Sequence, residues 1–193
     1  MIATILAMMT LADPAHQMVG EYNPSGPKIV FTMKGGSQFV IATDPVNSPL
    51  TTAHILDLVR RGFYNGQRVH RVEWWVTQFG APASKYEDLD VKGPDGKMML
   101  NEKIGDGGSG KSVPFERSEV EFVRGVVGIA SEGLQKGGDS QIFILRQDAR
   151  RLDFSYAALG KVVSGMDVVG GIRRGDRIIS AVVQGEAVKG KKK

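Results

Sequence analysis

The amino-acid sequence predicts a single, mainly β domain with many tight turns. The chain has 193 residues, of which 41% are hydrophobic, and this is enough to bury one sizeable core. Its 25 glycines exceed the usual share of about 7%. The hydrophobic residues fall in short runs rich in β-branched and aromatic side chains, with glycine and proline between them. This pattern is typical of turn-dense β architectures.

Composition excludes several kinds of site. The chain has no cysteine, which rules out disulfides, thiol catalysis and cysteine-bound metals. Three histidines lie too far apart for a zinc site, so neither a metal nor a cofactor is expected: His16, His54 and His70. Four C-terminal lysines can account for the net charge of +4, so nucleic acid is not expected as a partner. They are Lys189, Lys191, Lys192 and Lys193.

The N-terminal segment allows two interpretations. Residues 1–12 are apolar and lack charged side chains, but they are too short for a membrane-spanning helix, so no stable membrane insertion is expected. They fit the apolar core of a signal peptide with small residues at Thr10 and Ala12, although the usual basic residues before the core are missing. The alternative is a helix or strand packed on the domain. We favour export to the periplasm over a cytoplasmic location.

The domain begins after a linker. Residues 13–27 contain three prolines and two glycines, which is typical of a linker. Two strand-like runs follow at 29–33 and 38–42, both dominated by β-branched and aromatic residues. Residues 34–37 between them contain adjacent glycines and predict a hairpin turn.

A helix is predicted next, beginning at Ser48-Pro49. Serine is a preferred N-cap, and proline is favoured at the first helical position. Three residues at helical spacing give this helix an apolar face: Ile55, Leu58 and Val59. Gly62 is expected to end it. His54 on this helix is interpreted as structural rather than catalytic.

Two further strand-like runs, 69–72 and 74–79, follow an Asn65-Gly66 turn signal. Arg71 lies among apolar neighbours in the first run. A guanidinium held against an apolar strand surface is costly unless partners or a ligand satisfy it. The pattern alone therefore leaves two interpretations of Arg71 open, a structural ion pair or a ligand-binding cation.

Residues 81–111 are polar and rich in glycine, and residues 105–110 suggest a phosphate-binding loop. The Gly-Lys-Ser/Thr that such a loop needs after four spacers is missing, and Pro114 prevents a helix from following. We therefore expect a solvated loop here.

Eight short motifs follow one another along the chain. The first three are GFYNG (62–66), VHRV (69–72) and QFG (78–80). The later ones are RGVVGIAS (124–131), DSQIFI (139–144), YAALGKV (156–162), GMDVV (165–169) and GDRII (175–179). In this order they resemble the motifs of the cyclophilin family of peptidyl-prolyl isomerases, in which GFYDG, FHRV and QGGDP correspond to the first three.

The resemblance covers residues 28–184. It implies a closed, eight-stranded antiparallel β-barrel capped by two α-helices, in which closure removes the sheet edges. Residues 1–27 then form the N-terminal segment with its linker, and residues 185–193 form a basic tail. Residues 83–104 look like an insertion, and we expect the protein to be a monomer.

The resemblance also implies an activity, catalysis of rotation about X-Pro peptide bonds in proline-containing polypeptides, which assists protein folding. Amide resonance gives this rotation a barrier of about 18–20 kcal/mol. Arg71 is expected to stabilise the twisted amide by hydrogen bonds, and Gln78 to orient Arg71. The residues expected to bind substrate are Trp75, Val76, Ala130, Ser131, Gln141, Phe143, Leu152, Tyr156 and Leu159.

Some positions depart from the family pattern. Val76, Arg151 and Leu159 stand where the family has methionine, an aromatic residue and phenylalanine. One alternative is therefore a catalytically weak cyclophilin-like module that binds proline-containing peptides, and another is an unrelated β-barrel that binds a different ligand. We favour the isomerase because the central residues are retained: Arg71, Gln78, Gln141 and Phe143.

Overall fold

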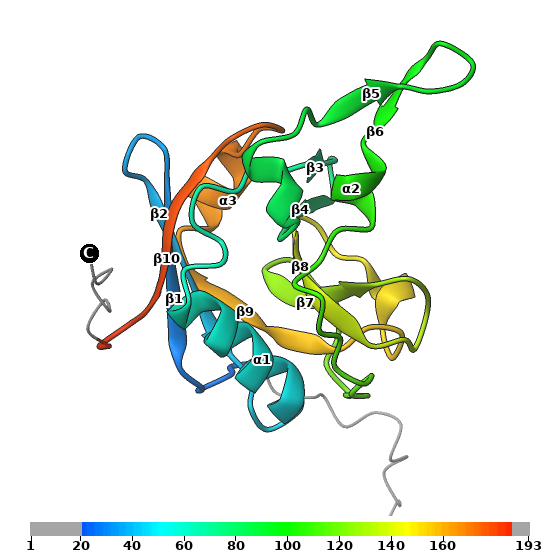
Figure 1. Ribbon diagram of the computed structural model, residues 1–193. Helices are drawn as coiled ribbons and strands as arrows, with labels where there is room; N and C mark the ends of the chain where they lie inside the picture. The colour runs from blue at the N-terminus through cyan, green and yellow to red at the C-terminus, as the bar shows by residue number, and fades with distance from the viewer. Residues whose placement is uncertain (1–20, 187–193) are drawn as a thin grey trace, which may run out of the picture.

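The computed structural model describes residues 21–186, so the predictions for residues 1–12 and for the terminal lysines lie outside the described residues. Eight strands form one curled antiparallel sheet in the order β10–β1–β2–β9–β7–β8–β4–β3 (Figure 1). This confirms the predicted mainly β fold. The strands are β1 (Lys28–Met33), β2 (Gln38–Thr43), β3 (Arg71–Val72), β4 (Val76–Phe79), β7 (Val126–Ser131), β8 (Gly138–Leu145), β9 (Ala158–Ser164) and β10 (Ile178–Val183).

The sheet curls but does not close, which corrects the predicted closed barrel. Its end strands, β3 and β10, form no ladder, and residues 66–69 lie against 175–178 instead. In the part of the chain that the structure describes, one isolated bridge joins Arg68 to Arg177 across this gap. Closure fails because β3 has only two residues before the chain turns, with Glu73 and Val76 exchanging backbone hydrogen bonds.

The core lies inside the curl and is built by strand alternation. Phe31 on β1 and Phe39 on β2 stack with ring centroids 5.0 Å apart. Tyr64 and Phe79 meet Phe31 edge-on, with centroids 5.9 and 5.3 Å from its own. All four rings are fully buried. Burying such a side chain stabilises the fold by about 1.5–3 kcal/mol, so this aromatic cluster fixes how the two halves of the sheet meet.

The predicted first helix is confirmed as α1 (Pro49–Arg60), but its N-terminus is capped differently. The Ser48 side chain makes no capping hydrogen bond. The carboxylate of Glu116 instead accepts hydrogen bonds from the backbone N–H groups of Leu50 and Thr51, both at 2.8 Å. A carboxylate there also complements the positive end of the helix dipole. After the helix, Gly62 adopts a left-handed conformation with φ of 69°.

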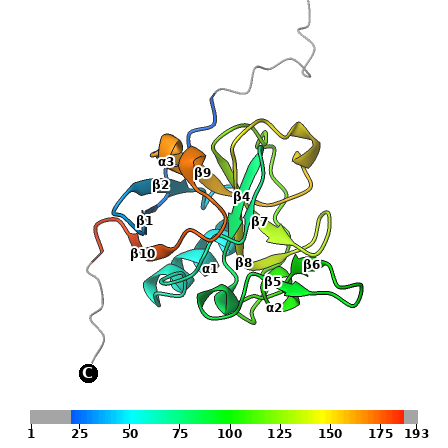
Figure 2. The same ribbon diagram turned by 90° about the horizontal axis from the view of Figure 1, so that it is seen from above.

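The second of the two helices that the resemblance implies is α3 (Met166–Gly171), and it follows Gly165, whose φ is 78°. Figure 2 and Figure 1 place α3 well away from α1, and apolar residues of both pack on the same core. A short third helix, α2 (Glu102–Gly105), was not predicted. Two short 3₁₀ turns, η2 (Pro82–Lys85) and η3 (Arg150–Leu152), complete the helical elements of the described residues.

Half of the segment interpreted as an insertion, residues 90–100 of 83–104, is a hairpin that projects from the sheet (Figure 2). It consists of β5 (Asp90–Lys92) and β6 (Met98–Leu100). Its base is held by Arg174, whose two terminal nitrogens donate to the Asp90 carboxylate at 2.6 and 2.7 Å. Arg174 also donates to the carbonyl of His70 at 2.7 Å, next to Arg71. Among the described residues, no helix has the length and apolar character needed to cross a membrane.

Candidate active site

A small cavity of about 140 Å³ opens on the outer face of the curled sheet. Strands β3, β4, β7 and β8 contribute side chains to it, and residues 152–156 close one side. All nine lining residues belong to the set predicted from the sequence. They are Arg71, Trp75, Val76, Gln78, Ala130, Ser131, Phe143, Leu152 and Tyr156.

The floor of this cavity is apolar and well packed. Phe143 and Val76 are 5% and 1% exposed, and both belong to a second core cluster behind the cavity. The ring of Tyr156 meets Phe143 edge-on with centroids 5.5 Å apart. Gly128 on β7 leaves the space that the Phe143 ring fills, because a Cβ there would lie 2.8 Å from Cε1 of that ring and closer still to Cζ. The floor therefore suits a small apolar ring.

Arg71 lies at the edge of the apolar floor and is held from three sides. Its Nε donates to Glu73 at 2.6 Å, and its Nη1 donates to Gln78 Oε1 at 3.2 Å. Its guanidinium carbon lies 5.4 Å from the centre of the Trp75 ring, within cation–π distance. The contact with Gln78 follows from strand register, since Arg71 on β3 is paired directly with Gln78 on β4. Both interpretations left open for Arg71 thus describe it, because it is ion-paired and also faces the cavity.

Glu73 was missed by sequence reasoning. Besides the bond from Arg71, its carboxylate accepts a hydrogen bond from Trp75 Nε1 at 2.8 Å. The hydrogen bond from Arg71 lowers the pKa of Glu73. The hydrogen bond from Trp75 and the positive charge of Arg151 also lower it. The sequence did contain a signal for Glu73, because a carboxylate two residues after a candidate catalytic arginine can pair with it.

Gln141 lines a larger hollow beside the small cavity, and it also supports Gln78. Its side-chain oxygen accepts a hydrogen bond from Gln78 Nε2 at 2.8 Å. Its own Nε2 lies within hydrogen-bonding distance of the carbonyls of Ile104, Gly105 and Gly107, at 3.0, 2.8 and 2.8 Å. Gln141 thus links the Arg71–Gln78 pair to the glycine-rich segment, instead of pointing into the small cavity.

A second, larger hollow of about 660 Å³ continues from the first. The two share Gln78, Ala130 and Ser131, so together they form one groove. Residues 105–114 and 130–139 provide most of the walls of the larger part. A groove of this length can receive an extended peptide whose one apolar ring enters the small cavity.

The sequence and the fold can now be compared with known proteins. The family model for "Cyclophilin type peptidyl-prolyl cis-trans isomerase/CLD" matches residues 28–189. The chain belongs to the cyclophilin family of peptidyl-prolyl cis-trans isomerases. This family assignment also makes the chain an isomerase, as predicted.

Relatives of this cyclophilin include a probable peptidyl-prolyl cis-trans isomerase of Brucella abortus (strain 2308), 33% identical over 193 residues that cover 93% of each chain. A peptidyl-prolyl cis-trans isomerase of Synechococcus elongatus is 28% identical over 144 residues, which cover 73% of this chain and 86% of the relative. Among solved structures, a cyclophilin-type isomerase of Cryptosporidium parvum shares the fold with a TM-score of 0.67 at 18% identity, covering 83% of this chain and 99% of the other. The same protein was also solved in the presence of the dipeptide Ala-Pro, and that structure has a TM-score of 0.66.

Leu159 does not line the cavity of this cyclophilin, contrary to the sequence-based expectation. It is fully buried in the main core cluster. Its neighbour Ala158 belongs instead to the cluster behind the cavity. The expectation came from the family resemblance, and core packing was its alternative. Successive residues of a strand point to opposite faces, and in β9 the side chain of Leu159 points into the main core.

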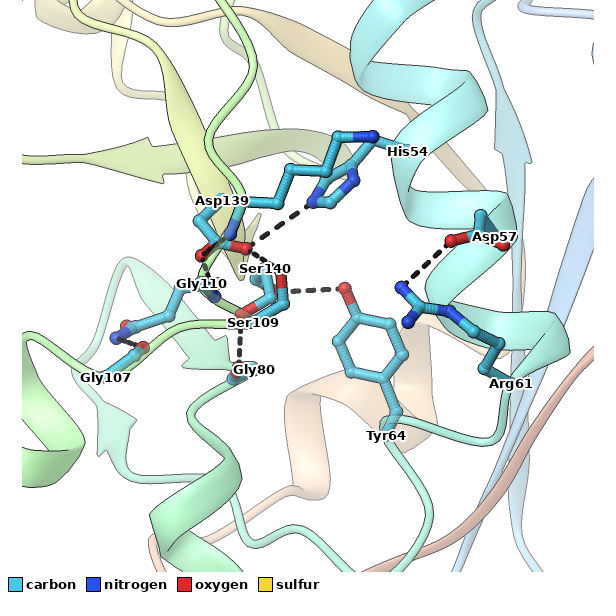
Figure 3. Close-up of polar contacts among 12 residues, drawn as sticks. His54, Asp57, Arg61, Tyr64, Gly80, Gly107, Ser109, Gly110, Asp139 and Ser140 are labelled. Atoms are coloured by element: carbon cyan, nitrogen blue, oxygen red, sulfur yellow. Dashed lines mark hydrogen bonds and ion pairs between the residues drawn. The ribbon is translucent and has the colours of Figure 1, made fainter.

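The glycine-rich segment 105–110 was expected to be a solvated loop. In the structure, hydrogen bonds to Asp139 hold the end of this loop in place (Figure 3). The Asp139 carboxylate accepts hydrogen bonds from the hydroxyl of Ser109 and from the backbone N–H groups of Gly110 and Lys111. His54 Nε2 on α1 lies 3.4 Å from the same carboxylate, which agrees with a structural role for His54. Asp139 thus fixes the wall of the larger hollow.

Proposed function

We propose that this cyclophilin binds proline-containing polypeptides in the groove and uses Arg71 to accelerate rotation of the X-Pro bond. The supporting observation is the position of Arg71 between the apolar cavity and the groove, with its guanidinium held by Glu73, Gln78 and Trp75. A guanidinium has five N–H donors, and two are used within the described residues, so the others can reach a ligand. Gln78 acts as the orienting residue.

The expected pose follows from the shapes of the two hollows. The proline ring would enter the small cavity and rest on Phe143, Val76 and Leu152. The rest of the peptide would extend past Ala130 and Ser131, whose backbone groups can pair with an extended chain. This leaves the prolyl carbonyl and imide nitrogen at the edge where Arg71 lies.

The chemistry needs no bond to be made or broken. Rotation localises charge as amide resonance is lost, and a preorganised cation that stabilises the twisted amide more than the planar one lowers the barrier. Arginine suits this role because its donors form a rigid planar fork. The apolar floor keeps water away from the imide, which prevents solvent from stabilising the planar state.

The decisive experiment is NMR exchange spectroscopy on an Ala-Pro peptide with wild type, Arg71→Ala and Arg71→Lys. We expect Arg71→Ala to lower the exchange rate by about 10²–10³-fold, the usual cost of removing an electrostatic donor. Peptide affinity, measured by chemical-shift titration, should change by only a few fold. Arg71→Lys should remain impaired because lysine lacks the fork.

A second candidate function is a proline-peptide binding module with little turnover. Arg151, which stands at the edge of the cavity where the family has an aromatic residue, is the observation that favours it. Chemical-shift changes on titration without accelerated exchange in the wild type would establish this module and refute the catalytic role of Arg71.

We further propose that the protein is exported to the periplasm and assists folding there. The apolar run at residues 1–12, with Thr10 and Ala12 at the spacing of a cleavage site, supports this location. Expression of the full chain in a Gram-negative host, followed by fractionation and N-terminal sequencing, tests it. Cleavage after Ala12 with recovery in the periplasmic fraction is expected, and an intact N-terminus in the cytoplasm would refute it.

A further inference from the structure

Arg151 lies at the rim of the small cavity and is fixed there by an aromatic ring. It belongs to η3, directly before the lining residue Leu152. Its side chain is exposed, yet its guanidinium carbon lies 4.2 Å from the centre of the Trp75 ring. Trp75 is itself a wall of the cavity. A guanidinium stacked on an aromatic face keeps its N–H edges free and loses less freedom when it binds a second group.

The charge of Arg151 has no carboxylate partner within the described part of the chain, whereas its neighbours are paired. Arg150 bonds Glu121 and Asp153 at 2.7 and 2.6 Å. Arg71 is paired with Glu73 at 2.6 Å. Arg151 makes no hydrogen bond or ion pair among residues 21–186, and its influence on Glu73 is electrostatic only. The cavity rim, with two arginines and one glutamate, therefore has a surplus positive charge.

The two ends of the groove differ in charge. The larger hollow is lined by three carboxylates and one lysine: Asp106, Glu132, Asp139 and Lys136. Trp75 and Leu152 line only the small cavity, whereas Gln78, Ala130 and Ser131 line both hollows. Arg151 thus marks the side of the proline cavity away from the acidic part of the groove. A bound peptide would meet positive charge on one side of its proline and negative charge on the other.

We propose that Arg151, stacked on Trp75, is a specificity-determining residue that selects polypeptides with aspartate or glutamate adjacent to the isomerised proline. The carboxylate lies on the side of the proline that faces the Trp75 wall, and it accepts a paired hydrogen bond from the planar guanidinium. This inference rests on the proposed function, because it assumes that the proline ring occupies the small cavity.

The test uses peptides of the form Ala-X-Pro-Y-Ala in which X or Y is Glu, Gln or Lys. Exchange rates and peptide affinities are measured by NMR for wild type, Arg151→Gln, Arg151→Lys and Arg150→Gln. At one of the two flanks we expect the wild type to favour Glu over Gln by about three- to fivefold, the range of a solvent-exposed charge pair. Lys at that flank should be disfavoured, and added salt should weaken the preference.

The three variants test whether the preference for Glu over Gln depends on Arg151. Arg151→Gln should remove it, and Arg151→Lys should keep only part because lysine cannot stack in the same way. Arg150→Gln should keep it, since Arg150 is already paired. A wild type that treats the Glu and Gln peptides alike at both flanks would overturn the proposal. So would a preference that survives in Arg151→Gln.

Failure of the proposed isomerase function would look different. If the wild type binds these peptides but accelerates none of them, catalysis is refuted, and the affinities still test the selectivity. If Glu and Gln peptides are isomerised at equal rates with equal affinities, catalysis stands and the selectivity by Arg151 is refuted.

Discussion

At Arg71, two side chains accept hydrogen bonds from the guanidinium and an indole ring covers its face. Glu73 also binds that indole through Trp75 Nε1, so one carboxylate sets the position of both the cation and the cavity wall. We infer that Glu73 is a positioning residue for the isomerase reaction. The effect of Glu73 on the reaction rate should depend mainly on Arg71 being present. A residue that only stabilises the fold would not show this dependence.

Replacing Glu73 with alanine should lower the isomerisation rate about five- to tenfold. Without Glu73 the Arg71 side chain can adopt more conformations, and ordering it on the twisted amide then costs more free energy. KM should change less than twofold. Glu73→Gln should retain more activity, since its oxygen can still accept from Arg71 Nε while its amide nitrogen cannot accept from Trp75. In an Arg71→Ala background the alanine change should lower the rate much less, by only what Glu73 contributes through Trp75. An equal loss in both backgrounds would show that Glu73 acts independently of Arg71.

At the scale of single elements, two features couple the local fold to the site. Strand β7 carries Gly128, which makes room for the ring of Phe143 on β8. Helix α1 takes its N-terminal cap from Glu116, which is 66 positions from Leu50 in sequence. In both cases the element depends on a residue outside it.

Gly128→Ala should push the Phe143 ring into the proline cavity. Overpacking of this kind typically costs about 1–3 kcal/mol of stability, and the narrowed floor should also weaken Ala-Pro peptide binding. Urea denaturation and chemical-shift titration measure the two effects. Gly170→Ala is the matched control, because a Cβ at this position in α3 meets nothing within 4 Å. Unchanged peptide affinity in Gly128→Ala would contradict the role assigned to this glycine.

Glu116→Ala should destabilise the protein by about 0.5–2 kcal/mol, the usual cost of losing an N-cap acceptor. The measurement is the free energy of unfolding in urea at neutral pH. Glu119→Ala is a suitable control, because Glu119 is exposed and has a long ion pair of 3.7 Å with Arg117. If both variants lose the same stability, Glu116 is not the effective cap.

These elements also show what the sequence could and could not predict. Local signals were reliable, and the hairpin at 34–37 and the start of α1 at Pro49 rest on short-range patterns. The contact of Gln78 with Arg71 was expected from the family resemblance, and the structure forms it through the pairing of β3 with β4. The capping partner of α1 could not be predicted, because Glu116 reaches it only through the fold. Leu159 was placed at the cavity from the family resemblance alone, whereas the face that its side chain occupies depends on how β9 pairs in the sheet.

At the scale of the whole molecule, the fold buries His70 directly before Arg71. His70 is 2% exposed, and its Nδ1 has no hydrogen-bond partner among residues 21–186. Burial lowers the pKa of His70 from 6.5 to about 4, and the charges of Arg174 and Arg71 add to this effect. The folded protein therefore holds His70 neutral where the unfolded chain protonates it.

Stability should fall as the pH drops from about 6.5 to about 4, because the unfolded chain binds a proton that the folded protein does not. His70 contributes about 2–3 kcal/mol to this loss. A His70→Asn variant should lose correspondingly less stability between pH 7 and pH 4.5, as measured by urea denaturation at each pH. Parallel losses in wild type and variant would show that other groups control acid unfolding.

Asp139 imposes a condition on how this sequence can change in evolution. A Cβ added to Gly108 would lie 2.9 Å from Cγ of Asp139 and closer still to one of its oxygens. A side chain at 108 therefore requires the Asp139 side chain either to leave the hydrogen bonds that hold residues 110 and 111 or to be replaced by a smaller one. The two positions are expected to covary among relatives, with a side chain at 108 found together with a residue smaller than aspartate at 139.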